Sequence, residues 1–70
     1  MKPANETIYR PKQAAAALGI SLATLWYRLD PKNRRFDPDM PRPFKLSERA
    51  VGFKASEISA YINRLAEHRI

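Results

Sequence analysis

Hydrophobic and polar positions divide the chain into five segments, and the first segment predicts a short helix. Pro11 suits the first turn of a helix, where its missing N–H is not needed. Four alanines and Leu18 follow, and alanine has the highest helix propensity and lets another helix approach closely. Gly19 can adopt the left-handed conformation that commonly ends a helix. We therefore expect a helix from residue 11 to residue 18.

A second helix is predicted almost immediately afterwards. Ser21 is a good N-cap because its hydroxyl can accept from the exposed amides of the first turn. The following apolar positions repeat at i, i+3, i+4 and i+7 and predict one stripe facing the core: Leu22, Leu25, Trp26 and Leu29. The complementary face carries Ala23, Thr24, Tyr27 and Arg28. Asp30 precedes Pro31, which disfavours the helical conformation at residue 30 and ends the helix.

Trp26 has two possible roles. It belongs to the apolar stripe, and large aromatic side chains dominate core burial, so we assign it to the core. If it were exposed instead, contact with a base or a sugar would become an option.

Residues 31–43 hold four of the six prolines without any period, which predicts a loop. Phe36 and Met40 are its candidates for contact with the core. Loops of this length in a small domain are usually functional. The loop also carries four cationic side chains, Lys32, Arg34, Arg35 and Arg42.

The last third of the chain predicts a hairpin and a third helix. Phe44, Leu46, Val51 and Phe53 alternate with polar or small residues, as in two short strands around residues 47–49. From Ala55 onward, apolar residues repeat at three and four positions and predict a helix that covers the core: Ile58, Tyr61, Ile62 and Leu65. We expect a monomer in solution, because this stripe is needed in the core and spans fewer than three heptads.

Length and composition limit the possible classes of protein. Seventy residues form one domain, for which we expect residues 8–70, preceded by a flexible arm of residues 1–7. No cysteine and a single histidine, His68, make a metal site or a disulfide unexpected, and we expect no cofactor. No phosphate-binding glycine loop or nucleophile motif is present, so we do not expect an enzyme. No apolar run approaches about 20 residues, so we expect no membrane association and a cytoplasmic protein.

A helix, a glycine turn and a second helix beginning at serine are the organisation of a DNA-reading helix-turn-helix. The polar face of the second helix would lie in the major groove, where hydroxyls and arginine bond phosphates or base edges. The alternative is that this face is simply solvated, as on most surface helices. The predicted fold is mostly α with a small β-hairpin, a winged helix-turn-helix of three helices and a two-stranded wing.

The positive charge is concentrated beside this helix. The net charge is +6, and residues 31–54 hold seven basic and three acidic side chains. A basic hairpin next to a recognition helix is typical of a wing that grips the DNA backbone. The alternative is that its cations protect a sheet edge from aggregation. The candidate DNA-binding residues are Ser21, Ala23, Thr24, Tyr27, Arg28, Arg34, Arg35, Lys45, Ser47 and Arg49. Among them Arg28 is our candidate for base readout.

Two segments, Arg10–Leu29 and Met40–Ile62, resemble a known family. The most specific matches are Leu18-Gly19-Ile20-Ser21, Thr24-Leu25-Trp26, Pro41-x-Pro43-Phe44-Lys45-Leu46, Arg49-Ala50-Val51-Gly52-Phe53 and Ser56-Glu57-Ile58. They resemble the AlpA family of phage and prophage regulators, which is similar to excisionase and MerR-type winged helices. The resemblance implies a small DNA-binding transcriptional regulator and, in some relatives, a factor that directs excision. Leu22 and Tyr27 stand where arginine is frequent, so no base preference is carried over.

The resemblance and the charge together predict the partners. We expect double-stranded DNA as the main partner, with integrase or RNA polymerase as candidate protein partners. One small module rarely binds tightly alone, so we expect several copies to bind cooperatively on DNA. An excisionase that bends attachment-site DNA remains an alternative, and so does a module that binds a host protein through its basic loop.

Overall fold

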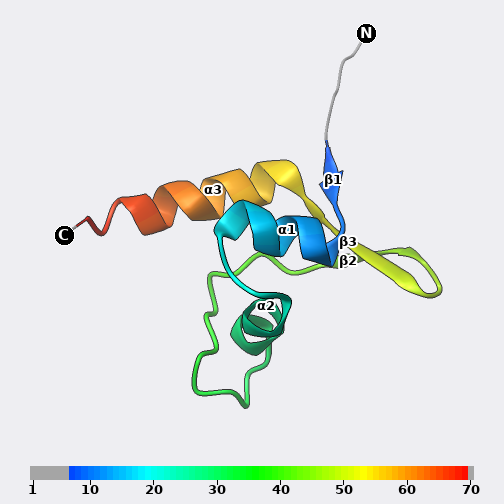
Figure 1. Cartoon of the computed structure of the whole chain (residues 1–70), viewed down its shortest axis with the longest axis horizontal. Helices are drawn as coiled ribbons and strands as arrows, with labels where there is room; N and C mark the ends of the chain where they lie inside the picture. Colours follow the sequence, from blue (N-terminus) through cyan, green and yellow to red (C-terminus); the bar gives the residue numbers. More distant parts are fainter. Residues whose placement is uncertain (1–6, 70) are drawn as a thin grey trace, which may run out of the picture.

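The computed structural model describes residues 7–69. Within this range it contains three helices, α1 (Pro11–Leu18), α2 (Leu22–Leu29) and α3 (Ala55–Ala66). The strands are β1 (Ile8–Tyr9), β2 (Phe44–Ser47) and β3 (Ala50–Lys54). This arrangement, drawn in Figure 1, confirms a mostly helical winged helix-turn-helix with a small β-hairpin. The predicted arm of residues 1–7 lies outside the described residues except for Thr7, whose carbonyl oxygen accepts the N–H of Ala55 (2.8 Å).

The sheet has one strand more than the predicted hairpin. β1 pairs antiparallel with β3, which also pairs antiparallel with β2, so the strand order is β1-β3-β2. Tyr9 lies opposite Phe53, and Phe44 lies opposite Gly52. A register shift between Lys45 and Ser47 marks a bulge near the hairpin turn. Two residues are too few to show strand alternation, which is why the sequence pattern did not predict β1.

The link between α1 and α2 follows the local sequence signals. Gly19 has a φ of 72°, and its N–H donates to the carbonyl of Ala16 (3.1 Å). The N–H of Ile20 donates to the carbonyl of Ala15 (3.0 Å), so the last carbonyls of α1 are satisfied by the turn. Ser21 Oγ then accepts the N–H of Thr24 (3.0 Å) and caps α2. The predicted helix end and helix start are both confirmed.

The core lies where all three helices and the hairpin base meet. Its buried residues are Ala14, Ala15, Leu25, Met40, Phe53, Ile58 and Tyr61. The two alanines give α1 a small-residue face, which lets both α2 and α3 pack closely against it. Tyr9, Leu18, Ile20 and Leu29 pack around this cluster.

Two predicted core stripes are only partly buried. Leu22 and Trp26 remain 38% and 40% exposed, so their assignment to the core is wrong. α2 packs mainly on α1, and this contact covers Leu25 and Leu29 but not the edge of the stripe.

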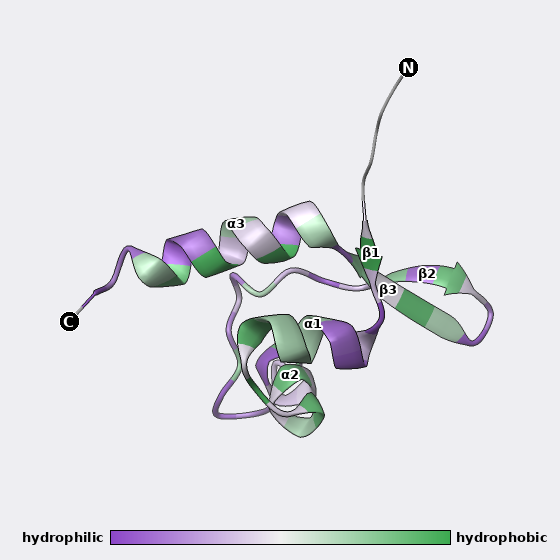
Figure 2. Cartoon of the chain, turned by 45° about the horizontal axis from the view of Figure 1, so that its top comes forward, coloured by the Kyte–Doolittle hydropathy of each residue, from purple (hydrophilic) through white to green (hydrophobic). Residues whose placement is uncertain are grey.

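The same correction applies to α3. Ile58 and Tyr61 are buried, whereas Ile62 and Leu65 are 38% and 45% exposed, contrary to the expected core stripe. The C-terminal turns of α3 extend past the end of α1 in both views (Figures 1 and 2), so α1 does not cover them. The argument for a monomer therefore depends on the shortness of α3, which has 12 residues.

The loop of residues 31–43 has no helix or strand, as predicted. Met40 is buried and Phe36 is half-buried, which fixes the loop to the core. Three carboxylate or amide side chains in or next to it accept the backbone N–H two residues later, at 2.8 to 2.9 Å: Asp30, Asn33 and Asp37. These Asx turns order a segment that lacks regular secondary structure.

Candidate nucleic-acid interface

The outward face of α2 carries the candidate reading residues. Ala23 and Tyr27 are exposed on the side opposite the buried Leu25, while Thr24 and Arg28 lie half-buried at one edge. Trp26 lies at the other edge and is exposed. Since Trp26 is not a core residue, its ring is available for contact with a base or a sugar.

The start of α2 has a small hydroxyl network. Ser21 Oγ accepts the N–H of Thr24 and donates its own proton to Thr24 Oγ1 (2.9 Å). A hydroxyl has one proton, so Ser21 has used its donor within the protein, whereas Thr24 can still donate its proton to a ligand oxygen. The positive end of the helix dipole lies at the same place, where it favours an anion such as a phosphate.

Arg28 is held by groups that the sequence analysis did not associate with it. Its Nη1 donates to the hydroxyl of Tyr61 (3.1 Å), and this hydroxyl donates to Asp37 Oδ2 (2.5 Å). The chain of bonds joins α2, α3 and the loop. Tyr61 was predicted only as an apolar position of the third helix, and nothing in the helical spacing indicates the partner of its hydroxyl.

These bonds shift two pKa values. The hydrogen bond from Tyr61 lowers the pKa of Asp37 against the opposing effect of desolvation, and the Asp39 N–H and the charges of Arg28 and Arg64 lower it further. Burial, followed by the hydrogen bond to Asp37, raises the pKa of Tyr61. At neutral pH the carboxylate is therefore ionised and the phenol is neutral.

The loop contributes one cation directly to the α2 surface. The Arg35 guanidinium lies 5.8 Å from the centre of the Tyr27 ring, within the range of a cation–π contact. Arg35, Thr24 and Arg28 also line the same hollow beside Tyr61. Arg34 is exposed in the same loop.

The hairpin carries the remaining candidate residues. Lys45, Ser47 and Arg49 are all exposed on it, near the bulge and the turn. Figures 1 and 2 show the hairpin projecting away from the C-terminal end of α3, and α2 lying on the other side of α1 from α3. Hydrophilic colour marks both the hairpin turn and the long loop (Figure 2).

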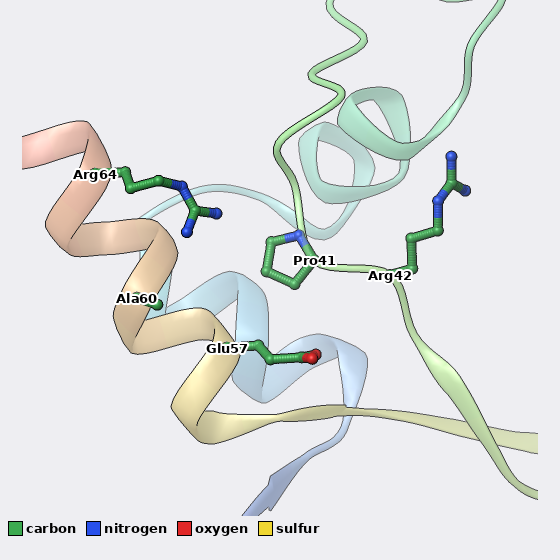
Figure 3. A pocket seen from close by; sticks show the side chains of 5 residues that line it. All are labelled: Pro41, Arg42, Glu57, Ala60 and Arg64. Carbon is green, nitrogen blue, oxygen red and sulfur yellow. The ribbon is translucent and has the colours of Figure 1, made fainter.

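A second hollow lies between the loop and α3. It is lined by Pro41, Arg42, Glu57, Ala60 and Arg64. Figure 3 shows Glu57 and Arg64 extending from α3 toward the loop, while Arg42 extends away on the far side of Pro41. None of the candidate DNA-binding residues lines this hollow.

Comparison with known proteins assigns a family to almost the whole described chain. The family model described as prophage CP4-57 regulatory protein (AlpA) matches residues 7–66. No curated protein and no solved structure gives a significant match. In residues 7–69 no helix has both the length and the apolar character needed to cross a bilayer. The same part of the chain has no group of three His, Cys, Asp or Glu side chains suited to a metal ion.

Proposed function

Because the chain belongs to the AlpA family of prophage regulatory proteins, we propose that it binds specific sequences in double-stranded DNA and regulates transcription for a phage or another mobile element. It would do so in the cytoplasm of a bacterial host. The observation that carries this proposal is the exposed face of α2, which has a serine cap at its start and a basic hairpin in the same small domain.

The side chains of α2 have the chemistry of a major-groove reader. Ala23 offers a methyl group that can contact the methyl of thymine, and Thr24 offers a donor proton. Arg28 is the proposed base-reading residue, since arginine pairs in a bidentate way with guanine. Tyr27 and Trp26 offer ring edges and faces beside it. Ala23 and Tyr27 occupy the exposed face of this eight-residue helix, with the half-buried Thr24 and Arg28 at one edge and Trp26 at the other.

The cationic side chains supply the contacts that do not depend on sequence. We assign Lys45, Ser47 and Arg49 to the DNA backbone or the adjacent minor groove, and Arg34 and Arg35 to phosphates near α2. Ser21 lies at the helix N-terminus, where a phosphate is favoured. Neutralising phosphates releases counterions and makes the affinity depend steeply on salt.

A titration of a duplex over a salt series tests the proposal. Affinity should fall steeply between about 50 and 200 mM salt. Arg49→Ala should weaken binding to every sequence and reduce the salt slope by about one unit. Arg69→Ala is the matched control, because it removes the same charge near the far end of α3, and it should change the slope little. Salt-insensitive 1:1 capture of a protein, without duplex binding, would instead support a protein-binding module.

The base-reading role of Arg28 has a separate signature. Arg28→Ala should relax specificity at one base pair and cost about 1 to 3 kcal/mol there. An equal loss of affinity for every sequence would contradict this role.

One module of this size buries only about 600 to 1,000 Å² on DNA, so we propose that several monomers bind neighbouring sites cooperatively. Sedimentation of the free protein and of its complex with a long duplex measures this directly. A bending assay on attachment-site DNA, with and without integrase, separates a regulator from an excisionase.

A further inference from the structure

The Tyr61 hydroxyl can act toward Arg28 only as an acceptor. A phenol has one proton, and Tyr61 donates it to Asp37 Oδ2 (2.5 Å). The oxygen that faces Arg28 therefore presents lone pairs, which accept the bond from Arg28 Nη1 (3.1 Å). Tyr61 is 1% exposed, so the position of this acceptor is fixed by the core. Asp37 thus holds the proton of the Tyr61 hydroxyl on its own side, so that a lone pair of the oxygen stays directed at Arg28.

Asp37 is itself held in place on several sides. Its Oδ1 accepts the N–H of Asp39 (2.9 Å), and its own N–H donates to the carbonyl of Arg28 (2.9 Å). Arg64 donates through Nη2 to the carbonyl of Asp39 (3.1 Å). Its guanidinium also lies 5.9 Å from the centre of the Tyr61 ring. Figure 3 shows Arg64 reaching from α3 toward the loop, as its bond to the Asp39 carbonyl requires.

Arg28 uses one N–H of Nη1 in its bond to Tyr61, which leaves the other guanidinium N–H groups for a ligand. A guanidinium is planar and has five N–H donors in fixed directions, so a bond at one of them restricts the orientation of the others. The side chain is half-buried and lines a hollow with Thr24 and Arg35, next to the exposed face of α2. A free arginine on a surface would lose considerable side-chain entropy on reading a base, and an oriented one loses less.

We propose that Tyr61 is a positioning residue for base recognition: with Asp37 it orients the guanidinium of Arg28 so that its remaining donors meet a guanine edge. This inference rests on the proposed function, in which Arg28 reads a base. It assigns a role in specificity to a core tyrosine that itself contacts no DNA.

The test uses a duplex that the wild-type protein selects from a random library, together with its single base-pair substitutions. Arg28→Ala should lower discrimination at one base pair by about 5- to 150-fold. Tyr61→Phe keeps the ring and removes the hydroxyl, and it should lower discrimination at the same base pair. In the double variant, discrimination should equal that of Arg28→Ala, because Tyr61 acts through Arg28. Tyr9→Phe, which removes a hydroxyl from a half-buried tyrosine elsewhere in the fold, is the control and should leave discrimination unchanged.

The outcomes separate the two proposals. If the wild-type protein selects no duplex, the proposed function fails and this inference fails with it. If Arg28→Ala relaxes one base pair but Tyr61→Phe does not, only the positioning role is overturned. An equal loss by Tyr61→Phe at every base pair would also overturn it, since that result indicates a structural role. Asp37→Asn provides a second variant that leaves Tyr61 intact, and it should relax the same base pair to a smaller extent.

Discussion

The hydroxyl of Tyr61 donates to Asp37 Oδ2 and so joins α3 to the loop that follows α2. The two residues are 24 positions apart in the sequence. The same hydroxyl accepts a hydrogen bond from Arg28 of α2. Because the acceptor is a carboxylate, the strength of this link depends on its ionisation. The link therefore connects the stability of the fold to pH.

Acid should weaken the fold through Asp37. Its pKa is lowered in the folded protein, first by the hydrogen bond from Tyr61. A lowered pKa means that the stabilisation is present above the unfolded-state pKa, near 4, and is lost as the pH falls through the folded-state pKa. Asp37→Asn should lower the free energy of unfolding at pH 7 by about 1 kcal/mol, a modest value because the carboxylate is partly solvated. It should also flatten the fall of stability with pH on the acid side of the curve (the acid limb).

Thermal unfolding followed by circular dichroism from pH 2.5 to pH 7 measures this effect. The control is Asp39→Asn, which removes an exposed carboxylate from the same loop but keeps the backbone carbonyl that accepts from Arg64. An acid limb in Asp37→Asn as steep as that of the wild type would show that other groups cause it.

Ser21 should have separable effects on stability and on DNA binding. Ser21→Ala removes the cap on the N–H of Thr24 and should cost about 1 kcal/mol, or about 4 to 8 °C in the melting temperature. Ser21→Asp keeps a capping oxygen and favours the helix dipole, so stability should be close to that of the wild type. The same aspartate would face DNA phosphates and should weaken duplex binding by roughly tenfold or more.

Ser59→Asp is the matched control for charge, because Ser59 is exposed on α3. It should reduce duplex affinity much less than Ser21→Asp does. Equal losses in the two variants would mean that net charge, rather than a phosphate near Ser21, explains the effect.

Local signals predicted the helix-turn-helix well. Gly19 and Ser21 act on neighbours within three residues, so the end of α1 and the start of α2 could be read directly from the sequence. The hairpin followed from its alternation and from the turn near Arg49. The face of α2 was also predictable, because helical spacing fixes which residues oppose Leu25.

Features that depend on distant neighbours were not predictable in this way. The exposure of Trp26 depends on how much of the α2 stripe α1 covers, and the spacing of apolar residues does not contain this information. β1 is recognisable only through its pairing with β3. The partners of Arg28 required the loop to fold back onto α3, which brings Asp37 and Tyr61 together from distant parts of the sequence.

The exposed Trp26 should report on DNA binding. It is the only tryptophan in the chain, so intrinsic fluorescence excited at the indole monitors this position alone. Because Trp26 is 40% exposed, we expect a red-shifted emission in the free protein and a change in intensity on adding a duplex. Trp26→Ala should cost little stability for an aromatic residue and weaken duplex binding by about 1 to 3 kcal/mol if a base or sugar packs on the ring.

Leu22→Ala is the control for Trp26→Ala, since Leu22 lies on the same edge of α2 with a similar exposed fraction. Emission that does not change at saturating duplex, together with wild-type affinity of Trp26→Ala, would exclude Trp26 from the interface.

Gly52 should be needed for the close approach of β1 to the hairpin. A Cβ at this position would lie 2.6 Å from Ile8 Cγ2, 3.1 Å from Leu46 Cδ1 and 3.3 Å from the carbonyl oxygen of Tyr9. Gly52→Ala should therefore destabilise the protein by about 1 to 3 kcal/mol, as overpacking usually does. Adding Ile8→Ala removes the closest clashing atom and should restore part of the loss.

Gly19→Ala gives the contrast that identifies this mechanism. A Cβ there would meet nothing within 4 Å, so the cost of about 1 to 2 kcal/mol comes from the left-handed backbone at φ 72°. Ile8→Ala should not rescue Gly19→Ala, because no contact is involved. Urea unfolding of the three single and two double variants, beside the wild type, measures both double-mutant cycles. If Ile8→Ala rescued both glycine variants, or neither of them, the result would contradict a steric role for Gly52 where β1 pairs with β3.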